Sequence, residues 1–249
     1  MRHSAFIAAI LAATIPLSAC GYSVFDAADD MQDGGFEGGT AITTAEQSTD
    51  AFTEVEAMGP DTVVLVTGDT FSIKAQGNAE AIKTLRYKMD GTAIQIGRNK
   101  GKWFGDSAKG VTITITAPKV SSVSLAGSGD FSADAMTGDK IELELAGSGD
   151  VSVAAITGKS LEGGIAGSGT IRVAGKVEHS KYDVAGSGNI DATKLASTDA
   201  DVSIAGSGDV ALTATGKVSA DIAGSGDVTV TGGAKCSKSV IGSGKVNCG

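Results

Sequence analysis

The chain has 249 residues, of which 36 are glycine and 3 are proline, and only 4% are aromatic. A hydrophobic content of 41% excludes a wholly disordered chain, and so much glycine excludes an ordinary helical protein, because each interior glycine costs about 1 kcal/mol of helix stability. The formal net charge of −9 argues against nucleic acid as a partner. Many short strands joined by glycine turns fit this composition.

The amino terminus has the pattern of a secretion signal. Arg2 precedes an apolar run from Ala5 to Leu17, which is too short to span a membrane as a permanent helix. The string LSAC at 17–20 resembles the bacterial lipobox, in which cleavage occurs before a cysteine that carries acyl chains. We therefore predict a signal peptide over residues 1–19 and membrane attachment through acylated Cys20; the alternative is an ordinary signal peptide with an incidental cysteine.

The mature chain then divides into a tether and a domain. Gly21 stands where an inner-membrane retention signal would place aspartate, so the outer membrane is favoured. Residues 20–50 are acidic and show no steady period, which predicts a flexible tether. Residues 51–249 form the domain, with an N-terminal part over 51–120 and a repetitive part over 121–249.

The N-terminal part of the domain shows the alternation of apolar and polar residues that is typical of strands. A helical turn is expected within 78–85, and MDGT at 89–92 is a hairpin signal. The predicted strands cover residues 61–68, 70–75, 92–97 and 111–118.

From residue 121 onward the chain repeats itself. The pentapeptide AGSGD and its variants recur every 18–20 residues, and each copy lies between two alternating segments. The first glycine of each GSG is Gly127, Gly147, Gly167, Gly186, Gly206, Gly224 and Gly242. A unit of this length cannot bury its own apolar face, but stacked coils can. The period therefore predicts an all-β fold, a parallel β-helix with coils of 18–20 residues, right-handed because parallel crossovers prefer that hand.

The GSG motif itself could be a scaffold or a site. It lacks the lysine of a phosphate-binding P-loop and does not have the Gly-x-Ser-x-Gly order of a nucleophile elbow. Glycine corners with a following Asp or Asn that accepts turn N–H groups favour the scaffold. Calcium bound by Asp130, Asp150, Asp209 and Asp227 stays open, although Thr170, Asn189 and Lys245 interrupt that column. We expect no cofactor and no metal.

Two other features bear on function. Cys236 and Cys248 are expected to form a disulfide in an oxidising compartment; a metal site or a reactive thiol are the alternatives. The loop over 97–110 either covers the edge of the core, which the sequence favours, or contacts a glycan or an acidic envelope polymer. Its candidate contact residues are Arg98, Lys100, Lys102, Trp103 and Phe104.

The sequence contains few candidate catalytic residues. The mature chain has one histidine, His179, beside Glu178, and such a residue is more often solvated than catalytic. The carboxylate pairs Glu142–Glu144 and Asp199–Asp201 fall on outward strand positions. We therefore expect no enzymatic activity.

The segments FTEVEAMGPDTVVLVTGDTFSIKAQGN, MDGTAIQIG and VTITITAPKVSSVSLAGSGD, followed by serial GSG corners, resemble the putative auto-transporter adhesin, head GIN domain family. The resemblance covers roughly residues 50–249 and is most specific at 111–130. It implies a secreted or lipid-anchored bacterial envelope protein with a β-helical fold, and it supplies no catalytic residues. The expected function is an adhesive or structural module with a glycan or surface protein as partner; the alternative is a β-helix that binds or cleaves polysaccharide.

Overall fold

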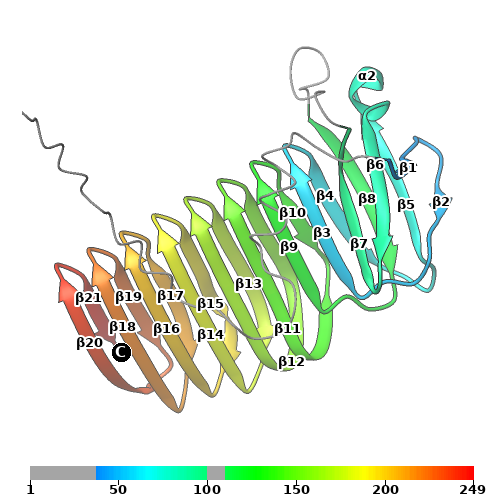
Figure 1. The fold of residues 1–249 in the computed structure, drawn as a ribbon. Helices are drawn as coiled ribbons and strands as arrows, with labels where there is room; N and C mark the ends of the chain where they lie inside the picture. Colours follow the sequence, from blue (N-terminus) through cyan, green and yellow to red (C-terminus); the bar gives the residue numbers. More distant parts are fainter. Residues whose placement is uncertain (1–37, 100–109) are drawn as a thin grey trace, which may run out of the picture.

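The computed structural model describes residues 38–99 and 110–249. These residues form a stack of β-coils, and Figure 1 shows the coils following one another from the N-terminal part to the red C-terminal coil. The helix α2 (Ala79–Ile82) lies at the N-terminal end of the stack (Figure 1). The predicted parallel β-helix is confirmed; its right hand stays a prediction.

Each repeat contributes one strand that ends at the GSG corner, in most repeats the longer one, and one strand that begins after it. The long strands pair in parallel into what we call the long-strand sheet: β9 (Ser122–Gly127), β11 (Met136–Gly147), the second half of β12 (Asp150–Gly167), β14 (His179–Gly186), β16 (Asp199–Gly206), β18 (Lys217–Gly224) and β20 (Lys235–Gly242). The strands after the corner form the short-strand sheet: β10 (Phe131–Ala133), the first half of β12, β13 (Thr170–Lys176), β15 (Asn189–Ser197), β17 (Val210–Ala214), β19 (Asp227–Thr231) and β21 (Lys245–Cys248).

The register places equivalent residues of successive repeats directly on one another. Leu145 pairs with Leu125 on one side and with Ile165 on the other. Alternate side chains point inward, so that the apolar residues before and after each corner, such as Leu145 and Val151, form two ladders through one continuous core. Burying each aliphatic side chain contributes about 1.5–3 kcal/mol, which the coil obtains only from its neighbours.

The N-terminal part does not stack in chain order. Strands β3 (Glu54–Gly59) and β4 (Thr62–Thr67) form one coil, which pairs with β9 and β10 on one side. On its other side this coil pairs with β7 (Ala93–Arg98) and β8 (Val111–Ala117). The chain must therefore run back past the β3–β4 coil between β8 and β9, through a crossing segment at 118–121.

Antiparallel strands close the N-terminal end of the stack. Strand β6 (Leu85–Asp90) forms the predicted hairpin with β7 around Gly91, and β5 (Ser72–Gly77) pairs with β8. The rings of Phe52 and Phe71 meet edge to face beneath them, with centroids 5.4 Å apart. An antiparallel layer at this position ends the stack because its strands cannot continue the parallel coil.

The packed domain begins earlier than the sequence predicted. The tether was expected to reach residue 50, but β1 (Thr40–Ala41) pairs with β6 and β2 (Gln47–Ser48) pairs with β5. Ile42 between them is buried in the core, at 2% exposure. The strands that pair with β1 and β2 lie more than twenty residues further along the chain, so no local pattern in the sequence predicts these two strands. Within the described ranges no helix is long and apolar enough to cross a membrane.

Candidate functional site

The GSG corners serve as a scaffold in this structure. All seven first glycines have φ between 125° and 143°, a region that L-residues with side chains rarely adopt. A Cβ at Gly147 would overlap the carbonyl oxygen of Gly127, and the same overlap recurs at every later corner. The amide of Ser148 donates to that oxygen at 2.9 Å, as the amide of Ser168 does to Gly147. The glycines therefore permit a close backbone approach that links consecutive coils.

The polar column after the corners is occupied by hydrogen bonds within the backbone ladder. The Asp130 carboxylate accepts from the amide of Asp150 at 3.1 Å, and the Asp209 carboxylate accepts from the amide of Asp227 at 2.8 Å. The Asp227 carboxylate accepts in turn from the amide of Lys245 at 2.8 Å. Among the residues that the structure describes, no group of three or more His, Cys, Asp or Glu side chains could hold a metal ion. These contacts favour the structural interpretation of the column.

The predicted contact loop divides between described and undescribed residues. Lys100, Lys102, Trp103 and Phe104 lie outside the described residues. The prediction that Arg98 contacts a ligand is wrong, because its side chain is fully buried and cannot reach a ligand at the surface. Its guanidinium donates two hydrogen bonds to the Asp61 carboxylate, at 2.7 and 2.6 Å. Asp61, the residue before β4, also accepts from the amide of Val111, so these contacts tie the start of β4 to the two strands that flank the loop.

Cys236 and Cys248 form the predicted disulfide, with Cα atoms 6.5 Å apart. It joins β20 in the long-strand sheet to β21 in the short-strand sheet. The register places Cys236 on Val218 and Cys248 on Val230, both of which are buried core residues one coil earlier. The disulfide therefore links the two sheets of the last described coil at positions where earlier coils use aliphatic side chains, with Cys236 half-buried and Cys248 exposed.

The outer face of the long-strand sheet is acidic. Its carboxylates are Glu142, Glu144, Glu162, Asp183, Asp201 and Asp221, and Glu54 and Glu56 of β3 continue this acidic face beside β9. Burial raises the pKa of Glu56, and nearby Asp90 and Glu54 raise it further, while a hydrogen bond from Gln95 opposes them. Lys181 and Lys140 lower the pKa of Glu162 despite its burial.

The carboxylate pairs considered for catalysis lie on this open face. Burial also raises the pKa of Glu144, and Glu142 and Glu162 add to the rise. None of these three carboxylates lines either of the two grooves described below. His179 is exposed at the edge of the same sheet, with Nδ1 3.8 Å from a carboxylate oxygen of Asp199. The arrangement fits a charged surface better than an acid–base pair around a bound substrate.

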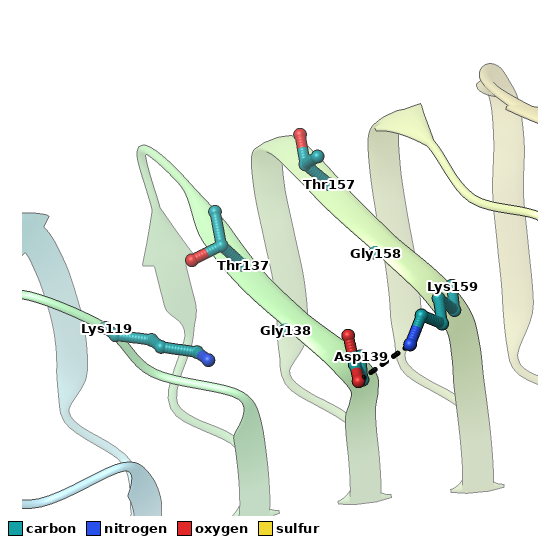
Figure 2. Close-up of a pocket in the computed structure, with 7 residues that line it drawn as sticks. All are labelled: Lys119, Thr137, Gly138, Asp139, Thr157, Gly158 and Lys159. Atoms are coloured by element: carbon teal, nitrogen blue, oxygen red, sulfur yellow. Dashed lines mark hydrogen bonds and ion pairs between the residues drawn. The ribbon is translucent and has the colours of Figure 1, made fainter.

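A groove of about 590 Å³ lies beside the crossing segment and is the candidate site (Figure 2). Lys119 of the crossing segment forms one wall, and two successive coils supply the rest: Thr137, Gly138 and Asp139 from β11, and Thr157, Gly158 and Lys159 from β12. Lys159 donates a hydrogen bond to the Asp139 carboxylate at 2.9 Å, the contact drawn in Figure 2. This hydrogen bond and the charges of Lys159 and Lys119 lower the pKa of Asp139.

The sequence analysis did not identify this groove. A signal was present, because Thr-Gly followed by a charged residue occurs at 137–139 and again at 157–159, one period apart. Lys119 could not have been added to that pattern, since its place beside the two coils follows from the crossing segment. A second groove, of about 370 Å³, lies at the N-terminal end between β1, β2 and β6, and its lining includes Asp50, Tyr87 and Lys88.

The family described as "Putative auto-transporter adhesin, head GIN domain" matches residues 51–234. No protein with a curated description matches the chain. Several crystal structures have the same fold. A putative adhesin from Bacteroides fragilis is 21% identical with a TM-score of 0.73, covering 83% of this chain and 99% of its own.

Two further structures come from Parabacteroides. A protein from Parabacteroides distasonis described as a putative lipid binding protein is 24% identical with a TM-score of 0.65, covering 82% of this chain and 95% of its own. A putative adhesin from Parabacteroides merdae is 20% identical with a TM-score of 0.63 and the same two coverages. At these identities the likeness concerns the fold.

Proposed function

The chain belongs to the putative auto-transporter adhesin, head GIN domain family, and on that premise we propose that it is a non-enzymatic, lipid-anchored interaction module of the bacterial cell envelope. The observation that carries the proposal is the lipobox-like string ending at Cys20, ahead of a domain of this family. Acyl chains on Cys20 hold the protein at the outer membrane, because each buried CH₂ contributes about 0.8 kcal/mol and several chains together give stable attachment.

The architecture suits a display role. Coils tied through the backbone at every corner make a stiff rod, and its outer faces carry charged and hydroxyl side chains that need no rearrangement to meet a partner. A rigid surface loses little conformational entropy on binding. We propose that the partner is an envelope glycan or a surface protein and that the module holds it without turning it over.

The second candidate is a protein that binds or cleaves polysaccharide. The groove beside Lys119 favours the binding half of this alternative, because its lining combines ammonium, carboxylate and hydroxyl groups. The cleaving half has no comparable support, since the carboxylates with raised pKa values lie outside that groove. Lipid binding, named for the Parabacteroides distasonis protein, would need an apolar cavity, whereas both described grooves carry charged and hydroxyl side chains.

Replacing the lipidated residue tests the anchoring. We expect Cys20→Ser to move the protein from the membrane fraction to the soluble fraction of cells, measured by immunoblot after ultracentrifugation. Cys236→Ser is the matched control, because it removes a cysteine that carries no lipid, and it should stay in the membrane fraction. A Cys20→Ser protein that remains in the membrane fraction would refute the proposal.

Protease treatment of intact cells tests the display. A domain on the outer surface is shaved from whole cells, whereas a periplasmic domain is cut only after the outer membrane is opened. Incubating the purified protein with envelope polysaccharides separates the two candidates, since release of shorter products that is abolished by Glu144→Gln would establish an enzyme.

A further inference from the structure

The groove beside the crossing segment combines parts of the chain that the repeat alone would not bring together. Lys119 belongs to the segment that returns past the β3–β4 coil, while the other six lining residues belong to two coils that stack in register. Figure 2 shows Lys119 on one side of the groove and the strands with Thr137 and Thr157 on the other. The crossing segment thus adds a wall to a flank that the coils themselves leave flat.

The floor of the groove is bare backbone. Gly138 pairs with Gly158, and a Cβ at Gly158 would come within 2.5 Å of the carbonyl oxygen of Gly138 and 3.2 Å of Ile141 Cδ1. Glycine is therefore required at this position because the coils approach closely, and Gly138 and Gly158 line the groove with backbone atoms. A flat ring can lie against such a floor, and the coil spacing of about 4.8 Å sets the distance between neighbouring polar groups along it.

The polar groups around the floor are available to a ligand. Thr137 pairs with Thr157 in register, both are exposed, and neither hydroxyl makes a hydrogen bond with a described residue. The Asp139 carboxylate is engaged by Lys159 on one oxygen only, which leaves further acceptor positions. Two neighbouring hydroxyls and a carboxylate are groups that hydrogen-bond the hydroxyls of a sugar.

The groove also carries an excess positive charge. Its charged side chains are Lys119, Lys159 and Asp139, and Lys159 is paired with Asp139. Lys119 is exposed and makes no ion pair or hydrogen bond with a residue in the described part of the chain. An ammonium group in this state attracts an anionic group of a ligand, although the chain as a whole has a net charge of −9. That net charge repels a ligand with many closely spaced anionic groups.

We propose that this groove binds an acidic oligosaccharide in which single carboxylate-bearing sugars alternate with neutral ones. Lys119 pairs with the sugar carboxylate, and Asp139 and the two threonine hydroxyls hold sugar hydroxyls above the glycine floor. The inference rests on the proposed role as an envelope interaction module and gives that module a ligand class. The groove is open, and the ion pair between Lys119 and the sugar carboxylate is exposed to solvent. Binding of a single oligosaccharide is therefore weak and salt-dependent.

Titration of the full-length protein in detergent tests this site, with binding followed by saturation-transfer NMR. A hyaluronan tetrasaccharide serves as the alternating acidic probe, a chitin tetrasaccharide as the neutral probe and polygalacturonate as the dense polyanion. We expect the alternating probe to bind most tightly and to weaken when NaCl is raised from about 0.05 M to about 0.5 M. Equal or tighter binding of either other probe, or no binding at millimolar concentration, would overturn the proposal.

A charge reversal locates the binding. We expect Lys119→Glu to weaken the alternating probe about tenfold and Lys119→Ala about threefold, because an exposed ion pair is worth a few-fold in affinity. Lys83→Glu at the C-cap of α2 makes the same change of net charge at the N-terminal end and should leave affinity within about twofold of the original protein. Equal losses in the Lys119 and Lys83 variants would show a general charge effect and refute the site. An unchanged melting temperature for Lys119→Glu verifies that the fold is intact.

The two proposals fail separately. Glycan binding by purified protein does not depend on where the protein resides in the cell, so a groove that binds nothing leaves the anchoring proposal standing. Conversely, a Cys20→Ser protein that stays on membranes refutes the anchoring and leaves the groove to its own test.

Discussion

At the scale of single residues, the corner glycines decide whether coils can stack. Each has a positive φ and a bare Cα against the carbonyl oxygen of the corner one coil earlier. Not every glycine of these strands has such a role. Gly164, three residues before Gly167 on β12, faces outward with nothing within 4 Å of a Cβ placed there.

The pair Gly167 and Gly164 therefore gives a controlled mutation. We expect Gly167→Ala to lower the free energy of unfolding by more than about 2 kcal/mol, because the alanine is strained at φ 136° and its Cβ collides with Gly147. Gly164→Ala should be neutral or slightly stabilising, since it only reduces the freedom of the unfolded chain. Urea unfolding followed by circular dichroism measures both, and equal effects would contradict the role assigned to the corner.

Two glutamates on the acidic face should respond to pH in opposite directions. The folded pKa of Glu56 is raised above its ordinary value of 4.5, so the folded state holds that proton more tightly and stability falls as pH rises through and above 4.5. The folded pKa of Glu162 is lowered, so its contribution is present at neutral pH and is lost as pH falls below 4.5.

Neutral glutamine variants separate the two effects. At pH 7 we expect Glu56→Gln to stabilise the protein and Glu162→Gln to destabilise it, each by about 0.5 kcal/mol or less because both groups are partly solvated. Glu56→Gln keeps an acceptor for the hydrogen bond from Gln95. The Glu56 difference should shrink towards zero as pH falls below 4.5, and the Glu162 difference only as pH falls further through its lowered folded pKa, because each glutamate is then protonated in both states. Thermal melts between pH 3 and pH 8 test this, and changes of the same sign at pH 7 would refute the assignment.

At the scale of elements, each coil depends on its neighbours, and the last described coil has a neighbour on one side within the described chain. Its strands β20 and β21 pair with β18 and β19. In register with the buried Val218 and Ala220 it carries Cys236 and Lys238, so its own apolar contribution is small. The disulfide replaces that contribution by a covalent link between the two sheets.

Reduction of this disulfide should loosen the C-terminal coil alone. A link that spans 12 positions contributes about 3 kcal/mol, and coils that contact only adjacent coils transmit little of its loss. Hydrogen exchange with and without a reductant should therefore show faster exchange in β20 and β21 and unchanged exchange in β14 and β16. Faster exchange throughout the stack would show that the coils unfold as one unit.

At the scale of the whole molecule, the polar column beside the corners holds the stack together through backbone hydrogen bonds. Asp130, Asp209 and Asp227 each accept an amide hydrogen of the following coil on one carboxylate oxygen, and Asp150 accepts from the Arg172 guanidinium. We therefore expect the melting temperature to be the same in 1 mM EDTA and in 1 mM calcium chloride. Differential scanning calorimetry measures this, and a rise of several degrees with calcium would establish the ion as part of the fold.

The repeat made the stack predictable. In a solenoid each coil pairs with the next, so the spacing of 18–20 residues in the sequence is also the pairing register in space, as Gly127, Gly147 and Gly167 show. The same logic places the apolar residues before and after each corner in the core. The disulfide was predicted from the oxidising compartment and from the two cysteines that remain besides Cys20. The structure joins Cys236 and Cys248 in the last described coil.

The sequence by itself determined the fold class, the coil length, the corner glycines and the core ladders. This was possible because each coil contacts the next one, so that the spacing of the repeat equals the pairing register between coils. Only the tertiary structure decided the features that depend on long-range contacts. Arg98 looked like a surface cation until Asp61, 37 residues earlier, was placed beside it. The crossing segment likewise brings Lys119 to two later coils, and no local pattern encodes that approach because the chain there leaves its stacking order.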